Sequence, residues 1–98
     1  MILNFADERT ERLYHGQRTK GLPPEIVRSA VRKLDMLNNA KLLNDLRSPP
    51  GNRLEPLHGD LDGLYSIRIN AQWRLVFVWS DGNADQVRIV DYHEEVNE

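Results

Sequence analysis

Apolar and polar residues along this chain follow two periods, a helical one in the first half and an alternating one in the second. The clearest helical stripe starts after Pro23 and Pro24, which a first helical turn accepts because their missing N–H groups are not needed there. The pattern predicts a helix that begins at these prolines and ends near Asn38 and Asn39. A less apolar helix is expected before it, capped by Asp7 and running to about residue 15. The stripe of the main helix consists of Ile26, Val27, Ala30, Val31, Leu34 and Leu37.

From Arg53 onward the period becomes two, which is typical of strands with one buried face. Pro56 in the first of these strands marks an edge or a bulge. Strands are predicted over residues 54–57, 64–69, 73–79 and 87–92, with turns at 70–72 and 80–83 and a short strand over 2–5 before the helices. The order β-α-α-β-β-β-β predicts an α+β fold in which two N-terminal helices pack on one face of an antiparallel sheet.

Burial determines how strands 64–69 and 73–79 should pair, because a shift of one residue exchanges the two faces of a strand. A three-residue loop places Ile67 opposite Leu75, and every residue paired on that face is apolar or aromatic. A two-residue loop would mix apolar and charged residues on both faces, so we favour the first register. The opposite face then carries Arg68 directly across from Arg74.

The face of the sheet away from the helices is predicted to be basic. Arg88 and Tyr92 of the last strand should share it, with His93 at the strand end, because the other face of that strand is apolar. Arginines and an aromatic ring on a sheet are typical of an RNA-binding surface, although a solvated face is the simpler interpretation. Since Arg68 and Arg74 would repel each other, an anionic partner is expected.

The composition of the 98-residue chain narrows its class. Its length predicts a single domain over residues 1–98. There is no cysteine, which excludes a disulfide framework, a thiol nucleophile and a cysteine-based zinc site. No apolar run approaches the roughly 18 residues of a membrane span, and the N-terminus lacks the pattern of a signal peptide. We therefore expect a cytoplasmic protein that does not act at a membrane.

The net charge of −2 conceals an asymmetry between two parts of the chain. Residues 9–53 carry ten Lys or Arg against four Asp or Glu, whereas the other residues carry three against eleven. A basic first half can bind a polyanion, although solvated helix faces would give the same composition. Arg18 and Lys20 lie in the polar connection between the helices and make it a candidate basic loop.

Several motifs in the second half resemble HigB-type toxins, which belong to the RelE/ParE superfamily of bacterial toxin–antitoxin systems. The motifs are RLEPLHG at 53–59, YSIRIN at 65–70, WR at 73–74 and DYH at 91–93. The resemblance extends over nearly the whole chain.

The resemblance implies a small α+β toxin that enters the ribosomal A site, cleaves translated mRNA and so inhibits translation. It also implies a HigA-type helix-turn-helix antitoxin as partner, through which the toxin reaches operator DNA indirectly. The implied reaction uses no metal or other cofactor: the ribose 2′-OH attacks the adjacent phosphate, and the 5′-oxygen of the next nucleotide leaves. Such a reaction needs a base, an acid and positive charge on the phosphorane.

The same resemblance assigns roles to residues of the site. Arg74 matches the arginine that holds the scissile phosphate, and Tyr92 and His93 match the terminal pair of the family. His93 is the better candidate to carry protons, because an unperturbed imidazole titrates near neutrality. Asp91 is expected to support the site rather than to catalyse. Residues expected to contact RNA are Arg68, Arg88, Arg18 and Lys20.

The chain departs from the family pattern around the first predicted strand of the sheet. Glu55 stands where some members carry a His, and His58 stands where they carry a Lys. Glu55 could act as the general base, or His58 could shuttle the proton, and either could pair with His93. The choice stays open, and the two substitutions are also compatible with weaker cleavage.

Two other functions are open to a chain of this kind. ParE-type proteins share the fold and bind DNA gyrase without cleaving RNA, and a weak toxin can act mainly as a co-repressor with its antitoxin. The combination of Arg74, Tyr92 and His93 favours nuclease chemistry, because a gyrase-binding protein has no need of it.

Overall fold

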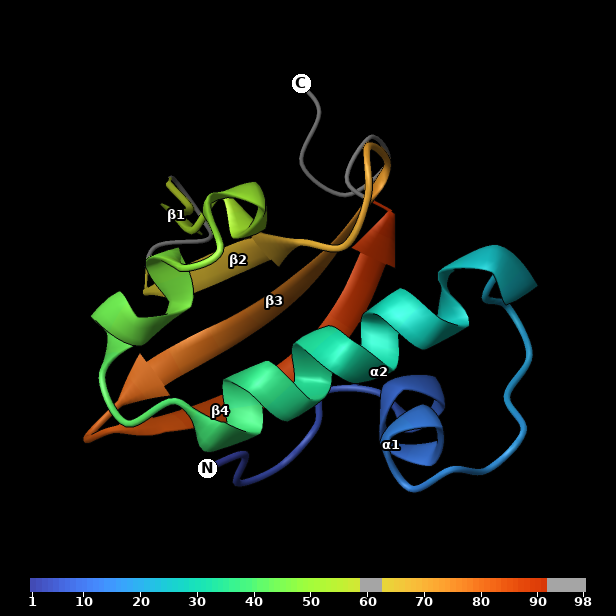
Figure 1. The fold of residues 1–98 in the computed structure, drawn as a ribbon. Coiled ribbons are helices and arrows are strands. Elements are labelled where there is room, and N and C mark those ends of the chain that lie inside the picture. Colours follow the sequence, from blue (N-terminus) through green and yellow to red (C-terminus); the bar gives the residue numbers. More distant parts are fainter. Residues whose placement is uncertain (59–62, 92–98) are drawn as a thin grey trace.

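The computed structural model of the chain describes residues 1–58 and 63–91. Within them a four-stranded sheet has the order β1-β2-β3-β4, and every neighbouring pair is antiparallel (Figure 1). The strands are β1 (Glu55–Pro56), β2 (Leu64–Arg68), β3 (Trp73–Ser80) and β4 (Asn83–Asp91). Helices α1 (Glu8–Tyr14) and α2 (Pro24–Asn39) precede the sheet, as do two short 3-10 helices, η1 (Leu43–Arg47) and η2 (Pro50–Asn52). The predicted α+β fold is confirmed.

Both predicted helices form, and each begins as the sequence indicates. The Asp7 side chain accepts a hydrogen bond from the Thr10 N–H at 2.9 Å, which satisfies one of the unpaired donors in the first turn of α1. Helix α2 begins at Pro24 and ends at Asn39, as predicted. None of the helices in the described part of the chain is long and apolar enough to cross a membrane.

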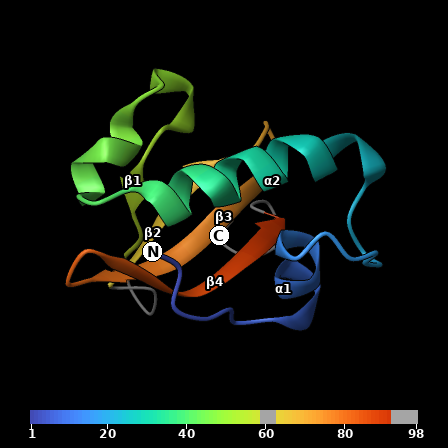
Figure 2. The same cartoon turned by 60° about the horizontal axis from the view of Figure 1, so that its bottom comes forward.

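Helix α2 lies across the sheet, and the main core is enclosed between the two (Figure 2). The buried residues include Ile26, Ala30, Leu34 and Leu37 from α2, and Ile67, Leu75, Phe77, Val87 and Ile89 from the sheet. Truncation of a large side chain in such a core typically costs about 2–5 kcal/mol. This layer therefore holds one face of the sheet in place and leaves the other face available for a site.

Strands β2 and β3 pair in the predicted register. Ile67 lies opposite Leu75 on the core side, and Arg68 lies opposite Arg74 on the outer side. The Asn70 side chain accepts two backbone N–H groups of the connecting turn, at 2.8 Å each. These bonds fix the length of the turn and with it the face on which each arginine lies.

The strand predicted over residues 2–5 is wrong, because this segment makes two isolated parallel bridges with β4 instead of a regular ladder. The Ile2 N–H donates to the side chain of Asn38 at 2.9 Å. Beside the segment, Gln86 has a φ of 51°, and its N–H donates to Asn4 Oδ1 at 3.0 Å. The register of β3 with β4 shifts between Val76 and Val78, so a β-bulge interrupts the ladder here.

Other strand boundaries also differ from the prediction, most of all the start of β4. Strand β4 begins at Asn83 rather than at Val87, because Asp81 and Gly82 have φ values of 54° and 79°. Positive φ at both positions is what a two-residue hairpin turn requires, so pairing continues up to the turn. Strand β1 is shorter than predicted, since Arg53 just before it has a left-handed φ of 47°.

The outer edge of β4 is bonded to α1. The buried Thr10 hydroxyl accepts the Ile89 N–H at 3.0 Å, and Arg9 Nη2 donates to the Ile89 carbonyl at 2.9 Å. The Arg9 guanidinium also lies over the Trp73 ring, 5.7 Å from its centroid. At Ile89, therefore, the edge strand has no neighbouring strand, and side chains of α1 make the hydrogen bonds of its backbone N–H and carbonyl groups instead.

Candidate active site

The outer face of the sheet, away from α2, carries two aligned rows of side chains. The registers align Glu55, Ser66, Val76 and Arg88 in one row and Arg68, Arg74 and Val90 in the next. Val76 and Val90 are buried together with Leu57 in a small second apolar cluster. The three arginines predicted for this face do share it, but part of the face is packed rather than solvated.

Arg74 is a buried cation on this face, with only 6% of the residue exposed. Its Nε donates to Ser66 Oγ at 2.8 Å, and its Nη2 donates to the backbone carbonyl of Arg53 at 2.6 Å. Removing a charge from water is costly, so a buried guanidinium needs such acceptors. The strand register predicted from the sequence is enough to assign Arg74 to this face. Its burial could not be predicted, because it depends on residues that only the fold brings beside it.

Glu55 provides a negative charge beside Arg74. Its Oε1 lies 3.9 Å from Arg74 Nη2, and 47% of the Glu55 side chain is exposed. Strand β2 separates β1 from β3, so this ion pair reaches across the strand that carries Ser66. The chain thus supplies part of the anionic charge expected near the facing arginines Arg68 and Arg74.

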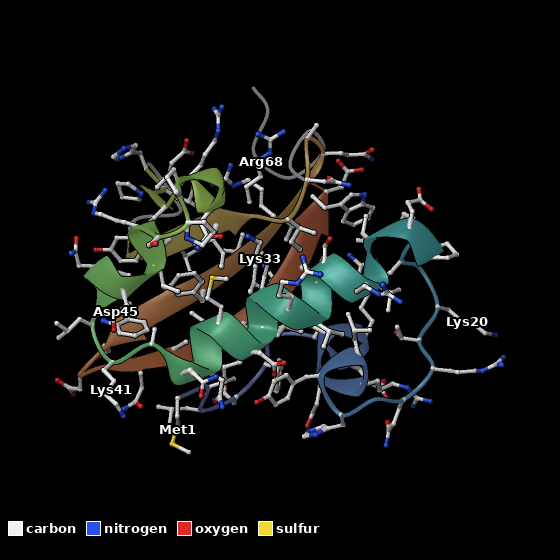
Figure 3. The ribbon with its side chains drawn as sticks, in the orientation of Figure 1. Met1, Lys20, Lys33, Lys41, Asp45 and Arg68 are labelled. Carbon is white, nitrogen blue, oxygen red and sulfur yellow. The ribbon has the colours of Figure 1, made fainter. Side chains whose placement is uncertain are left out.

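An open hollow of about 320 Å³ lies beside Arg74, at the end of the sheet where Figure 3 labels Arg68. It is lined by Arg53, Glu55, Arg68, Asn70, Ala71 and Arg74. Three arginines and one glutamate therefore border the same space. Guanidinium groups match the geometry of phosphate oxygens, so this hollow suits a phosphate-bearing ligand.

The sequence alone does not indicate the roles of two residues in this arrangement, Arg53 and Ser66. Arg53 follows η2 in a left-handed conformation, and this turns its carbonyl to the Arg74 guanidinium. Ser66 is fully buried within β2. A buried serine in a strand does indicate a hydrogen-bonding role, but the sequence does not identify the partner.

The other candidate bases and proton carriers lie in different places. His58 follows β1, is exposed, and is not among the residues that line the hollow. Asp91, at the end of β4, accepts a hydrogen bond from Gln72 Nε2 at 2.7 Å. The chain continues from there to Tyr92 and His93, and both of these predicted site residues lie outside the described part of the structure.

The predicted RNA contacts fall into two groups. Arg68 and Arg88 share the outer face with Arg74, whereas Lys20 is at the far side of the molecule from Arg68 (Figure 3). Arg18 and Lys20 border a separate hollow of about 520 Å³. The remaining lining of that hollow is Glu8, Arg9, Arg12 and Thr19. The structure therefore does not bring the basic loop to the Arg74 hollow.

Two groups with shifted pKa values brace the segment between α2 and β1. Burial lowers the pKa of Lys33, whose Nζ donates to the buried side chain of Asn52 in η2. Hydrogen bonds from the backbone N–H groups of Leu42 and Lys41 hold the pKa of Asp45 below its ordinary value. The contact of Lys33 with Asn52 holds η2 against α2, next to the carbonyl that binds the buried arginine, and the bonds of Asp45 hold the start of η1.

A family profile described as "RelE-like toxin of type II toxin-antitoxin system HigB" matches residues 3–93. The chain belongs to the HigB-like toxin family. The resemblance read from the sequence motifs is confirmed, because the match covers all the motifs that carried it. As a toxin of a type II system, a HigB-like toxin has an antitoxin as its partner.

Three curated relatives match most of this HigB-like chain. Toxin HigB-1 of Vibrio cholerae serotype O1 is 46% identical over 85 residues, which are 86% of this chain and 90% of the relative. An uncharacterised protein of Haemophilus influenzae is 35% identical over 85 residues, 86% of this chain and 84% of the relative. Endoribonuclease HigB of Proteus vulgaris is 30% identical over 93 residues, 95% of this chain and 100% of the relative.

Solved structures of related toxins have the same fold. A mutant of YafQ from E. coli superposes with a TM-score of 0.60 at 16% identity, over 89% of this chain and 86% of YafQ. A chain of the YoeB–YefM complex from Staphylococcus aureus gives a TM-score of 0.55 at 23% identity, over 83% of this chain and 84% of that one. Identities this low show the fold and nothing more about the site.

Proposed function

We propose that this HigB-like toxin is an endoribonuclease that cleaves mRNA on the translating ribosome and so inhibits translation. The observation that supports this most is the buried Arg74 guanidinium, which borders a hollow together with Arg53, Arg68 and Glu55. The relative named Endoribonuclease HigB aligns over 95% of the chain, which supports the same chemistry.

In the proposed reaction the scissile phosphate lies in the hollow beside Arg74. A base removes the proton of the ribose 2′-OH, the O2′–P bond forms, and the P–O5′ bond breaks as the 5′-oxygen receives a proton from an acid. The phosphorane between these steps carries extra negative charge, and a guanidinium already held in place stabilises it without reorganisation. The reaction needs no metal or cofactor, and the products are a 2′,3′-cyclic phosphate and a 5′-hydroxyl.

One proton transfer is assigned to a residue that lines the hollow, and the other to the motif at the end of the chain. Glu55 is favoured as the base because its carboxylate lines the hollow, whereas His58 is exposed beyond the end of β1. His93 is proposed as the acid, with Tyr92 orienting the nucleotide or assisting the transfer. These last two assignments rest on the sequence motif, since both residues are outside the described structure.

RNA binding is proposed to use the two basic surfaces separately. Arg68 and Arg88 flank Arg74 on the outer face and would hold the mRNA backbone next to the scissile phosphate. Arg18 and Lys20 border the second hollow and would contact ribosomal RNA in the A site. Positive charges spaced in this way strengthen binding to a polyanion without reading its sequence.

The proposed partner is a HigA-type helix-turn-helix antitoxin, which neutralises the toxin and links it indirectly to operator DNA. Because the proposed substrate is mRNA on ribosomes, the proposed site of action is the cytoplasm. A gyrase-binding function is the main competing outcome of the experiment that follows.

The test is primer extension on an mRNA translated in vitro, with the wild-type protein and with His93→Ala. We expect new in-frame 5′ ends only when ribosomes are translating and the wild-type protein is present. An uncut message, together with trapped gyrase–DNA complexes in a parallel assay, would replace this proposal with gyrase binding. Equal cutting by both proteins would keep the nuclease but remove His93 from its chemistry.

A further inference from the structure

Ser66 is a buried polar residue that belongs to neither of the two apolar clusters. It lies in the middle of β2, is fully buried, and faces away from α2 in the row of Glu55 and Val76. Serine is not favoured in strands, and burying a hydroxyl without a hydrogen bond costs free energy. A residue of this kind is expected to have a specific hydrogen-bonding task.

The task of the Ser66 hydroxyl is given by its contact with Arg74. Ser66 pairs with Val76, so Arg74 is its diagonal neighbour on the same face of β3. The 2.8 Å bond from Arg74 Nε to Ser66 Oγ lies within the buried part of the sheet. Arg74 Nη2 also approaches the Ser66 carbonyl, at 3.5 Å.

Hydrogen bonds to two different elements hold the plane of the Arg74 guanidinium. Ser66 Oγ on β2 accepts a hydrogen bond from Nε of Arg74, and the Arg53 carbonyl, which follows η2, accepts one from Nη2 at 2.6 Å. The guanidinium is planar, so fixing two of its three nitrogens fixes the orientation of the whole group. A neutral hydroxyl orients the guanidinium and leaves its positive charge intact. A second carboxylate in the same place would neutralise that charge.

We propose that Ser66 is a positioning residue for cleavage, which holds the Arg74 guanidinium in the plane required to stabilise the phosphorane. This inference rests on the proposed nuclease function. Ser66 itself touches neither the substrate nor the transferred proton, and its effect passes entirely through Arg74.

The kinetic test compares four proteins: wild type, Ser66→Ala, Arg74→Lys and the double variant. Cleavage of a ribosome-bound mRNA is followed to give the maximal rate and the toxin concentration that gives half of it. Hydrogen bonds to charged groups are strong, so Ser66→Ala should lower the maximal rate by roughly tenfold. The half-maximal concentration should change by less than about threefold, because binding and positioning are separate effects.

The double variant distinguishes positioning from a general structural role. A lysine has no guanidinium plane to orient, so Ser66→Ala should have less than about a twofold effect in the Arg74→Lys background. Ser80→Ala, an exposed serine at the other end of the strands, serves as the matched control and should cleave like the wild type. Equal losses in both backgrounds, or a Ser66→Ala protein as fast as the wild type, would overturn the inference.

A spectroscopic measurement tests the contact without any activity. In a ¹⁵N–¹H spectrum the Nε–H of Arg74 should be protected from exchange in the wild type and should lose that protection in Ser66→Ala. Unchanged protection and chemical shift would contradict the positioning role. A wild-type protein that fails to cut mRNA but shows this protection would instead refute the proposed function and leave the contact intact.

Discussion

Glu55 Oε1 lies 3.9 Å from Nη2 of Arg74, so a carboxylate and a buried guanidinium border the same hollow. His58 is only three positions further along the chain, yet it is exposed and is not part of that lining. If the phosphate binds at Arg74, Glu55 is therefore the residue placed to take the 2′-OH proton.

Removing the base should slow cleavage far more at Glu55 than at His58. Loss of a general base typically costs about 10²–10⁴-fold, so we expect Glu55→Gln to lower the maximal cleavage rate by at least about 10²-fold. Gln keeps the size of the side chain and can still accept a hydrogen bond. His58→Gln is the matched comparison, with an expected loss within about fivefold. A larger loss at His58 than at Glu55 would reverse the assignment of the base.

The basic loop should affect binding but not chemistry. Replacing Arg18 and Lys20 together with Gln removes two exposed charges from a surface distant from Arg74. We expect the half-maximal toxin concentration to rise and its dependence on the logarithm of the salt concentration to become shallower by about one to two units. The maximal rate should stay within about twofold of the wild type.

A binding titration to programmed ribosomes over a salt series measures this effect. Arg28→Gln removes an exposed charge from α2 and is the control for charge alone. If the loss of one charge at Arg28 weakened ribosome binding as much as the loss of one charge in the loop, the proposed role of Arg18 and Lys20 in ribosome binding would be wrong.

The contact between α1 and the edge of β4 should contribute measurably to stability. Thr10→Val removes the acceptor of the buried Ile89 N–H but keeps the shape of the side chain. An unsatisfied buried donor costs about 1–3 kcal/mol, and we expect a loss of that size in the free energy of unfolding in urea. Thr19→Val, a half-buried position in the connection between α1 and α2, should change it by less than about 0.5 kcal/mol. Equal effects would mean that Thr10 does not satisfy the edge.

Asp45 should make stability depend on pH at the start of η1. The backbone N–H groups of Leu42 and Lys41 lower the pKa of its carboxyl in the folded chain. A folded-state pKa below the unfolded value stabilises the protein above the unfolded pKa, and this contribution is lost as the pH falls through the folded pKa.

We therefore expect Asp45→Asn to lower the melting temperature at pH 7, and the difference from the wild type to shrink below about pH 4. Thermal unfolding of both proteins at several pH values measures this. Asp35→Asn, an exposed position on α2, is the control. A difference that persists unchanged at low pH would show that the charge of Asp45 is not what stabilises the turn.

Periodicity was sufficient to predict the parts of the fold in which burial decides the answer. The stripe of α2 and the pairing of Ile67 with Leu75 follow from the need to bury one face, and both are as predicted. The N-terminal segment and the start of β4 were mispredicted because side chains and turn geometry decide them. Neither the bond from Ile2 to Asn38 nor the positive φ of Asp81 and Gly82 leaves a periodic signal.

The candidate site shows the same division. The sequence predicted that Arg68 and Arg74 share a face, because the register sets which side chains alternate outward. It could not predict the burial of Arg74, which depends on a carbonyl 21 positions away in the chain and on the hydroxyl of Ser66. Such contacts exist only once η2 and β1 have folded beside β2.

The most direct test of the account is the rate at which ribosome-bound mRNA is cut by Arg74→Ala, compared with Arg28→Ala. Removing a group that stabilises transition-state charge typically costs about 10²–10³-fold, and we expect that loss for Arg74→Ala. Arg28 is an exposed arginine on α2, and its variant should cut within about twofold of the wild type. A folded Arg74→Ala protein that cuts as fast as the Arg28→Ala control would contradict the central claim that cleavage is centred on Arg74.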